Sequence, residues 1–337
     1  MIRLSQNENP LGPSPKAMEA VLKQVSALNH YPEPHAYSLK KKLAERLNLE
    51  PENVLVSAGE VESLDIMIRN FVGEGNNMIV GEISFIGYRL LAKVFKVEAR
   101  FSKLKDYKMD VDEILRCCDE HTKLIIIDNP NNPTGAIVSE QELIRLLEQI
   151  SSGTLVVVDE AYMEYVTQVN FPDSPRLLQR YPNLVVMRTF SKIYGLAALR
   201  VGYTIANPAV VEKMEHYQAP FTVNGLGLVA AMHAMDDVEF VAQSKAANEK
   251  ERRRLYNELK MLGNNVVPSQ SNYQFVYFDT VDQRDHFYTE LFGSGIMAQK
   301  TDSFGAENAL RVSIGRAEDN SAVIDCFSLN SVSTKLI

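Results

Sequence analysis

The sequence predicts an α/β fold, with one large, mainly parallel sheet and a smaller α+β domain. From about residue 46, short apolar runs alternate with longer stretches of helical periodicity, and the runs are apolar throughout. Continuous apolar runs between helices indicate strands buried on both faces, as in a parallel sheet covered by helices. The 337 residues also exceed what one hydrophobic core usually fills, so we expect a large and a smaller domain.

The expected elements of the large domain follow one another in regular order. Strands are expected at residues 53–57, 77–80, 124–128, 154–159, 184–187 and 201–204, and helices at 64–71, 85–95 and 139–150. The last of these helices begins with Ser139 and has Glu142 three residues on, which is the pattern of a capping box.

After Tyr203 the pattern changes to that of an α+β module. We expect a long charged helix at 238–262, strands at 272–278 and 309–314, and a helix at 284–292. The predicted large domain covers residues 46–250, and the small domain combines residues 1–45 with 251–337.

Composition excludes several classes of protein. The net charge is −8 and no basic cluster occurs, so we expect neither a nucleic-acid nor a membrane partner. The N-terminus lacks the apolar core of a signal peptide, and the most apolar long stretch, 223–235, is too short to span a bilayer. Three cysteines, two of them adjacent, favour a reducing cytoplasm, and the histidine spacing predicts no metal site.

The most informative stretch runs from Arg188 to Arg200 and follows a strand. It places Ser191, Lys192 and Arg200 in one short turn. A lysine amine at that position suits a Schiff base with a phosphorylated aldehyde, while the hydroxyl and the guanidinium hold the phosphate. Ser-Lys pairs are also common on protein surfaces, so the interpretation depends on further motifs.

Asp159 ends the strand at 154–159 and is followed by Glu-Ala-Tyr162. An ionised aspartate there can hold a protonated pyridine nitrogen and make the ring an electron sink. The alternative is a helix cap, which Lys192 at a later strand end disfavours. Tyr162 can reach a phenolic oxygen on the same ring, or it can pack.

Three more stretches follow strand ends. The turn Asp128-Asn-Pro-Asn-Asn132-Pro-Thr-Gly135 can direct the Asn132 amide at a ring oxygen. The small-residue turn at Gly59 and Glu60 offers backbone N–H groups and a helix N-terminus to an anion. Phe85 can stack on a flat ring or belong to the core. Because ligands bind at the carboxyl ends of parallel strands, these residues are expected to meet.

The ordered motifs resemble those of the aspartate-aminotransferase superfamily of pyridoxal-phosphate enzymes. Within it, the chain is most similar to the histidinol-phosphate aminotransferases, which are class-II aminotransferases of fold-type I. The resemblance runs from about residue 4 to about residue 325 and implies a large sheet of the seven-stranded type. It rests on Asn132-Pro-Thr-Gly135, Asp159-Glu-Ala-Tyr162, Thr189-Phe-Ser-Lys192, Arg200-Val-Gly-Tyr203, Asn7-Glu-Asn-Pro10, Tyr31-Pro-Glu-Pro34 and Leu310-Arg-Val-Ser-Ile-Gly315.

The resemblance implies pyridoxal 5′-phosphate as the cofactor and a role for each residue. Lys192 is implied to form the Schiff base and to move the proton, with Asp159 and Tyr162 as the other catalytic residues. The implied cofactor-binding set also includes Gly59, Glu60, Phe85, Asn132, Thr189, Ser191, Arg200 and, from the partner subunit of a homodimer, Tyr31.

The implied substrate-binding residues are Asn7, Arg311, Gln299 and Lys300. Arg311 takes the place of the arginine that binds the substrate's carboxylate or phosphate. Two stretches depart from the family: Val61 stands where Asp or Asn usually precedes Glu62, and Gln299 and Lys300 stand where an arginine usually helps bind phosphate. A lysine supplies only a point charge there.

The leading hypothesis is therefore transamination between histidinol phosphate and 2-oxoglutarate, as in histidine biosynthesis. The stretches Gly59-Glu-Val-Glu-Ser63 and Phe221-Thr-Val-Asn224 also resemble threonine-phosphate decarboxylase. A decarboxylase of that kind and an aminotransferase for another amino acid remain the alternatives. A non-enzymatic sensor module of a DNA-binding regulator is disfavoured, because the chain has no basic patch.

Overall fold

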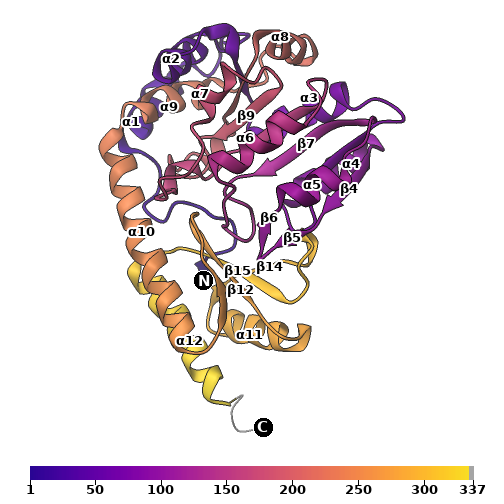
Figure 1. Cartoon of the computed structure of the whole chain (residues 1–337). Helices are drawn as coiled ribbons and strands as arrows, with labels where there is room; N and C mark the ends of the chain where they lie inside the picture. The colour runs from indigo at the N-terminus through magenta and orange to yellow at the C-terminus, as the bar shows by residue number, and fades with distance from the viewer. Residues whose placement is uncertain (334–337) are drawn as a thin grey trace.

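The computed structural model describes residues 1–333 and has a large sheet domain beside a smaller one (Figure 1). The large sheet has seven strands in the order β2-β10-β9-β8-β7-β3-β4. Its strands are β2 (Val54–Ser57), β3 (Asn77–Gly81), β4 (Glu98–Ser102), β7 (Thr122–Asp128), β8 (Leu155–Asp159), β9 (Leu184–Thr189) and β10 (Gly202–Ala206). The expectation of an α/β fold with a large seven-stranded sheet is thus confirmed.

The central strands are parallel, whereas β10 runs antiparallel to both β9 and β2. In register, Asp128 at the end of β7 lies opposite Asp159 at the end of β8. Two acidic residues thus lie side by side at the carboxyl edge of the sheet, which is the edge where ligands bind in folds of this kind.

Helices cover both faces of the large sheet, because its strands are apolar on both sides. Ile125 and Ile127 of β7 pack into one buried cluster, and Leu124 and Ile126 pack into another on the opposite face. The helices are α1 (Pro15–Gln24), α2 (Tyr37–Leu47), α3 (Glu60–Phe71), α4 (Ile86–Phe95), α5 (Val111–Cys117), α6 (Glu140–Gln149), α7 (Ser174–Leu178), α8 (Pro208–Tyr217) and α9 (Gly225–Met235). The capping box predicted at Ser139 and Glu142 is present at the start of α6.

The long helix α10 (Val238–Met261) leads down to the small domain, where the N-terminus also lies (Figure 1). There a four-stranded antiparallel sheet has the order β11-β12-β15-β14, and β1 pairs with β13 in parallel. The elements are β1 (Ile2–Arg3), β11 (Asn265–Val267), β12 (Tyr273–Tyr277), α11 (Val281–Gly293), β13 (Ile296–Met297), β14 (Gln299–Lys300), β15 (Ala309–Ser313) and α12 (Ala317–Ser333). A hairpin, β5 (Leu104–Lys105) and β6 (Lys108–Met109), extends from the large domain.

The domain boundaries stay a prediction, and the packing of the N-terminal segment bears on them. Leu4 packs in the cluster of the small domain, whereas Leu39 and Leu43 of α2 pack in a cluster of the large sheet. Residues 1–45 thus contact both domains. Within residues 1–333, no helix is long and apolar enough to cross a membrane.

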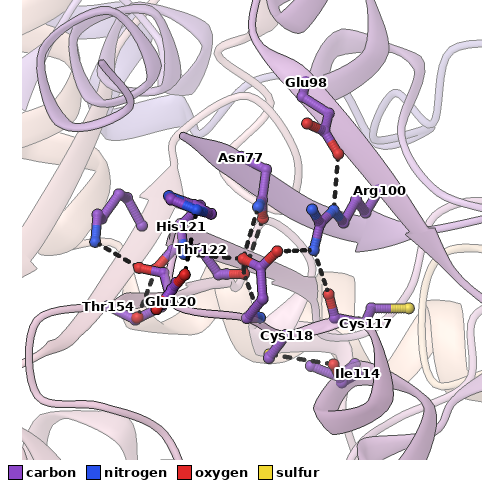
Figure 2. A network of polar contacts seen from close by, with 12 residues as sticks. Asn77, Glu98, Arg100, Ile114, Cys117, Cys118, Glu120, His121, Thr122 and Thr154 are labelled. Carbon is purple, nitrogen blue, oxygen red and sulfur yellow. Dashed lines mark hydrogen bonds and ion pairs between the residues drawn. The ribbon is translucent and has the colours of Figure 1, made fainter. Parts of the chain in front are cut away.

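A polar network joins strands at the edge of the large sheet that lies opposite its carboxyl ends (Figure 2). The Asn77 amide donates to Asp119 Oδ1 at 3.0 Å, and Arg100 Nη1 lies 2.6 Å from Asp119 Oδ2. The Thr122 hydroxyl donates to Asn77 Oδ1 at 2.8 Å. Because these residues lie on or beside β3, β4 and β7, the network ties the three strands together away from the ligand edge.

Candidate active site

The carboxyl ends of β7, β8 and β9 open into a cavity of about 310 Å³. Helix N-termini and the N-terminal segment of the chain form its other walls. Most of the predicted cofactor residues meet here. The lining consists of Gln6, Glu8, Glu60, Val61, Phe85, Tyr88, Asp128, Asn132, Asp159, Ala161, Tyr162, Thr189, Ser191, Lys192, Ala197 and Arg200.

Lys192 enters the cavity from the turn after β9. Its Nζ donates to the backbone oxygen of Gln6 at 3.2 Å and lies 5.4 Å from the centre of the Tyr162 ring. No carboxylate among the described residues forms an ion pair with it. The amine therefore faces the cavity without an acidic partner, which leaves it available to a ligand.

Asp159 is buried at the base of the cavity. The backbone N–H of Ala161 donates to its Oδ1 at 3.1 Å, and the Tyr88 hydroxyl donates to its Oδ2 at 2.7 Å. Two other carboxyl groups lie nearby. Burial, and then the charge of Asp159, raises the pKa of Asp128 to about 7, and the same two causes raise the pKa of Glu60 well above its usual range. Asp128 and Glu60 therefore keep their protons to a higher pH than free carboxyl groups do.

Gly59, Ser191 and Arg200 form a cradle for an anion at the N-terminus of α3. Arg200 Nη1 donates to the Ser191 hydroxyl at 3.4 Å, and that hydroxyl accepts from Thr189 Oγ1 at 2.9 Å. A Cβ atom at Gly59 would lie 2.3 Å from Arg200 Nη2, so only glycine lets the guanidinium approach this backbone. The helix N-terminus and the guanidinium both attract negative charge.

Asn132 and Tyr162 lie on the other side of the cavity and are joined to the small domain. Asn132 Nδ2 donates to the Tyr162 hydroxyl at 3.4 Å, and Asn7 Nδ2 donates to the same oxygen at 2.9 Å. Arg311 of β15 donates from Nη1 to Asn132 Oδ1 at 2.5 Å and from Nη2 to the Ser5 oxygen at 2.6 Å. Its Nε has no hydrogen-bond partner within the described part of the chain. Arg311 is thus a buried cation that contacts Asn132 of the cavity lining without lining the cavity itself.

Phe85 lies at the start of α4 and lines the cavity. Its ring meets the Tyr88 ring edge to face, with 5.6 Å between the centroids. Its backbone N–H donates to Asp128 Oδ2 at 3.3 Å. The ring is therefore held at the cavity wall, as a stacking role would require.

Six of the predicted site residues do not line the cavity: Gly59 and Arg311, described above, and four whose surroundings are as follows. Asn7 is buried, with its Oδ1 accepting from the Ser313 hydroxyl at 2.9 Å. Gln299 lies opposite Arg311 in the small sheet and donates to its neighbour's oxygen. Lys300 forms an ion pair with Asp285 at 2.6 Å. Tyr31 is 84% exposed and contacts Phe221. Their assignments to substrate and to a partner's cofactor stay predictions.

The structure adds two residues to which the sequence argument gave no role. Asp128 is held by the backbone N–H of Asn132 at 3.0 Å and by the Asn131 amide at 2.8 Å, and so shapes the turn that carries Asn132. Tyr88 contacts Asp159. A signal for Asp128 was present, because two aspartates end adjacent strands. No sequence pattern distinguishes Tyr88 from a core residue on α4.

The residues present fit pyridoxal phosphate. The Gly59 cradle, which a Cβ atom would fill, presents a guanidinium, a hydroxyl and a helix N-terminus to a phosphate. Asp159 offers a carboxylate to a ring nitrogen, Asn132 and Tyr162 offer donors to a ring oxygen, and Lys192 offers an amine to an aldehyde. Among the described residues, no group of His, Cys, Asp and Glu side chains could hold a metal ion.

Comparisons with known proteins agree with this geometry. The family model of aminotransferase class I and II matches residues 1–327. Histidinol-phosphate aminotransferase 2 of Pseudomonas aeruginosa is 37% identical over 95% of this chain and 86% of its own length. The crystal structure of a putative histidinol-phosphate aminotransferase from Erwinia carotovora has a TM-score of 0.92 and 28% identity, covering 100% of this chain and 97% of that chain.

A Sinorhizobium meliloti histidinol-phosphate aminotransferase, solved in complex with pyridoxal 5′-phosphate, shares the fold with a TM-score of 0.93 at 22% identity, over 99% of this chain and 91% of that one. The family match covers nearly the whole chain, including every strand that carries a site residue. The chain belongs to the class I and II aminotransferases, which are pyridoxal-phosphate enzymes.

Proposed function

We propose that this protein is the aminotransferase that exchanges an amino group between histidinol phosphate and 2-oxoglutarate. The observation that carries the proposal is the single cavity in which Lys192, Asp159 and the Arg200 cradle converge, one residue away from the buried Arg311. Relatives that are named histidinol-phosphate aminotransferase support the choice of substrate.

In this proposal each side chain has a task defined by its place. The bound cofactor supplies the electron sink and carries the amino group. Lys192 would hold it through its Nζ, and the same Nζ would accept the substrate's proton and return it.

Asp159, Asn132 and Tyr162 orient the ring, and the cradle of Gly59, Ser191 and Arg200 holds the phosphate. Asp159 keeps a positive charge on the ring nitrogen, because a carboxylate stabilises a neighbouring protonated nitrogen. Asn132 and Tyr162 are both largely buried at the cavity wall, so their donors would be held in place for the ring oxygen.

Arg311 is the residue proposed to bind the anionic end of both substrates. It is 4% exposed, and burial lowers its pKa from the usual value. Its contacts to Asn132 and to the Ser5 oxygen leave it without a carboxylate partner among the described residues. A substrate carboxylate or phosphate would supply the missing charge, as buried charges require.

A second candidate function follows from the surroundings of Gln299 and Lys300. The Gln299 amide donates to the Lys300 oxygen, and the Lys300 ammonium is paired with Asp285. Neither therefore offers an unpaired cation to a second phosphate. This favours an aminotransferase for an unphosphorylated amino acid, acting through the same Lys192. A decarboxylase of threonine-phosphate type is an alternative on sequence resemblance alone, because its substrate would need the same phosphate contact.

The experiment that separates these functions is a substrate screen with the loaded enzyme. Amine transfer from histidinol phosphate to 2-oxoglutarate without release of CO2 supports the proposal, and CO2 release from threonine phosphate supports the decarboxylase. Lys192→Ala should lose the visible absorption of the bound cofactor and nearly all turnover. Turnover retained in that variant would exclude Lys192 as the attachment site.

The active unit is proposed to be a homodimer in the cytoplasm. Tyr31 is exposed and lies among other exposed apolar side chains, including Leu28 and Phe221, as a surface covered by a second copy would require. In the dimer, Tyr31 would reach the partner's phosphate, so Tyr31→Phe should weaken cofactor retention without splitting the dimer. Fully active monomers in sedimentation would contradict this. The three cysteines are free thiols, which suits a reducing compartment.

A further inference from the structure

Tyr88 is a buried aromatic residue whose hydroxyl reaches the catalytic cavity. It lies in the first turn of α4, is 0% exposed, and packs in the apolar cluster between α3, α4 and the large sheet. Its hydroxyl nevertheless donates to Asp159 Oδ2 at 2.7 Å. A hydrogen bond of this length to a carboxylate belongs to the strong, charge-assisted class.

The bond acts on a carboxylate with few other restraints. The backbone N–H of Ala161 donates to Oδ1 at 3.1 Å, and the buried Glu60 carboxyl group also lies within hydrogen-bonding reach of Asp159. The Tyr88 and Ala161 donors take one oxygen each, so together they fix the plane of the carboxylate at the base of the cavity. Removal of Tyr88's hydroxyl would leave Oδ2 without this donor.

Two further carboxyl groups lie around Asp159. Burial, and then the charge of Asp159, raises the pKa of Glu60 from α3 and of Asp128 from β7, and Lys192 lines the same cavity. Burial and the neighbouring Asp159 raise the pKa of Tyr88 well above its usual range, so its hydroxyl keeps its proton at neutral pH. Tyr88 is thus a permanent donor in a group of acids.

We propose that Tyr88 is a positioning residue for transamination, whose hydroxyl fixes both the orientation and the negative charge of Asp159. The inference rests on the proposed contact of Asp159 with the cofactor's ring nitrogen. A donor to Oδ2 lowers the proton affinity of the carboxylate, so the proton shared with the ring stays on the nitrogen. Without this donor, the ring would be less positive and a weaker electron sink.

The test is Tyr88→Phe, which removes the hydroxyl and keeps the packed ring. In the loaded enzyme, a less positive ring leaves the nitrogen bound to Lys192 more basic, so the pH titration of the visible absorption band should move upward by about one unit. We expect kcat to fall by about tenfold or more with little change in KM, since one charged hydrogen bond is lost.

The matched control is Tyr181→Phe. Tyr181 is also buried, and its hydroxyl donates to the Glu148 carboxylate at 3.0 Å; neither residue lines the cavity. The Tyr181→Phe variant should leave both the pH titration of the visible absorption band and kcat unchanged. A double-mutant cycle with Asp159→Asn should be strongly non-additive, because Tyr88 acts through Asp159.

A second replacement works in the opposite direction. 3-Fluorotyrosine at position 88 keeps the hydrogen bond to Asp159 but makes its donor more acidic, so the pH titration of the visible absorption band should move downward. This variant tests the inference even if Tyr88→Phe fails to fold. A titration unchanged from wild type in every folded variant would overturn the inference. If wild type binds the cofactor through Lys192 while the Tyr88 variants behave like wild type, only this inference fails. If wild type does not bind it, the proposed function fails as well.

Discussion

Gly59→Ala tests whether the turn before α3 holds the cofactor's phosphate. Gly59 has φ +80° and ψ 163°, a region that is essentially restricted to glycine. An alanine would add backbone strain of about 1–3 kcal/mol. Its Cβ would also lie 2.3 Å from Arg200 Nη2 and 2.9 Å from Cζ, so the guanidinium would have to withdraw.

The magnitude follows from the contact that withdrawal removes. A charge-assisted hydrogen bond from the guanidinium to a phosphate contributes about 1.5–3 kcal/mol. The dissociation constant of pyridoxal phosphate should therefore rise by about ten- to a hundredfold. Arg200→Ala should raise it by a similar factor, and the double variant should be little worse than either single one.

The assay is titration of the cofactor-free protein with pyridoxal phosphate, followed by visible absorbance, with Tm measured in parallel. The control is Gly75→Ala, because Gly75 also has a positive φ, +77°, but no atom within 4 Å of its added Cβ. It should lower Tm without changing cofactor affinity. If Gly59→Ala binds the cofactor as tightly as Gly75→Ala does, the cradle assignment is wrong.

The remaining predictions concern the ring, the substrate and the stability of the sheet. Asp159→Asn should keep the fold but reduce kcat by about a hundredfold, because it removes a charged partner worth about 3 kcal/mol. Asparagine caps a helix N-terminus as well as aspartate does, so an unchanged kcat would indicate that Asp159 is only a helix cap. Gln299→Arg should raise kcat/KM for histidinol phosphate by about tenfold through one new charged pair, with no gain for glutamate. Finally, hydrogen bonding from Asn77, and then from Arg100, holds the pKa of Asp119 well below its usual range. A carboxyl group with a lowered pKa stabilises the folded state at pH values above its pKa in the unfolded chain, and this stabilisation is lost as the pH falls. The Tm advantage of wild type over Asp119→Asn should therefore be full at pH 7 and shrink below about pH 4. An advantage that is the same at pH 7 and pH 3 would contradict this.

Much of the large domain could be predicted because its signals are local. The apolar runs that became β7, β8 and β9 are buried on both faces, and the motifs after them lie at one edge of the sheet by topology alone. The strand β4 was missed because it lies at the sheet edge with little burial, so its residues Glu98–Ser102 are not a continuous apolar run. The orientation of β10 depends on the path of the connection before it, which periodicity does not report.

The small domain was harder to predict, since its sheet is built from short pairings between distant segments. β1 and β13 have two residues each and are 294 positions apart in the register Ile2↔Ile296. β14 is equally short, and the pairing of Gln299 with Arg311 follows only from the fold. The contact of Tyr88 with Asp159 likewise depends on how α4 packs on the sheet. In the sequence alone, each of the two residues also fits a purely structural role.

The N-terminal segment shows why an opening motif can matter to a site whose other residues lie far along the chain. The Ser5 oxygen accepts from Arg311, the Gln6 oxygen accepts from Lys192, and Asn7 donates to Tyr162. Backbone oxygens serve two of these three contacts, so the path of the segment matters more than its side chains there. Asn7 has φ +57° and is anchored at both its backbone N–H and its Oδ1 by the Ser313 hydroxyl. Asn tolerates this left-handed conformation better than most residues. The motif therefore combines a conformational requirement with a donor to Tyr162, and it holds residues of the small domain and of the large domain to one another at the cavity.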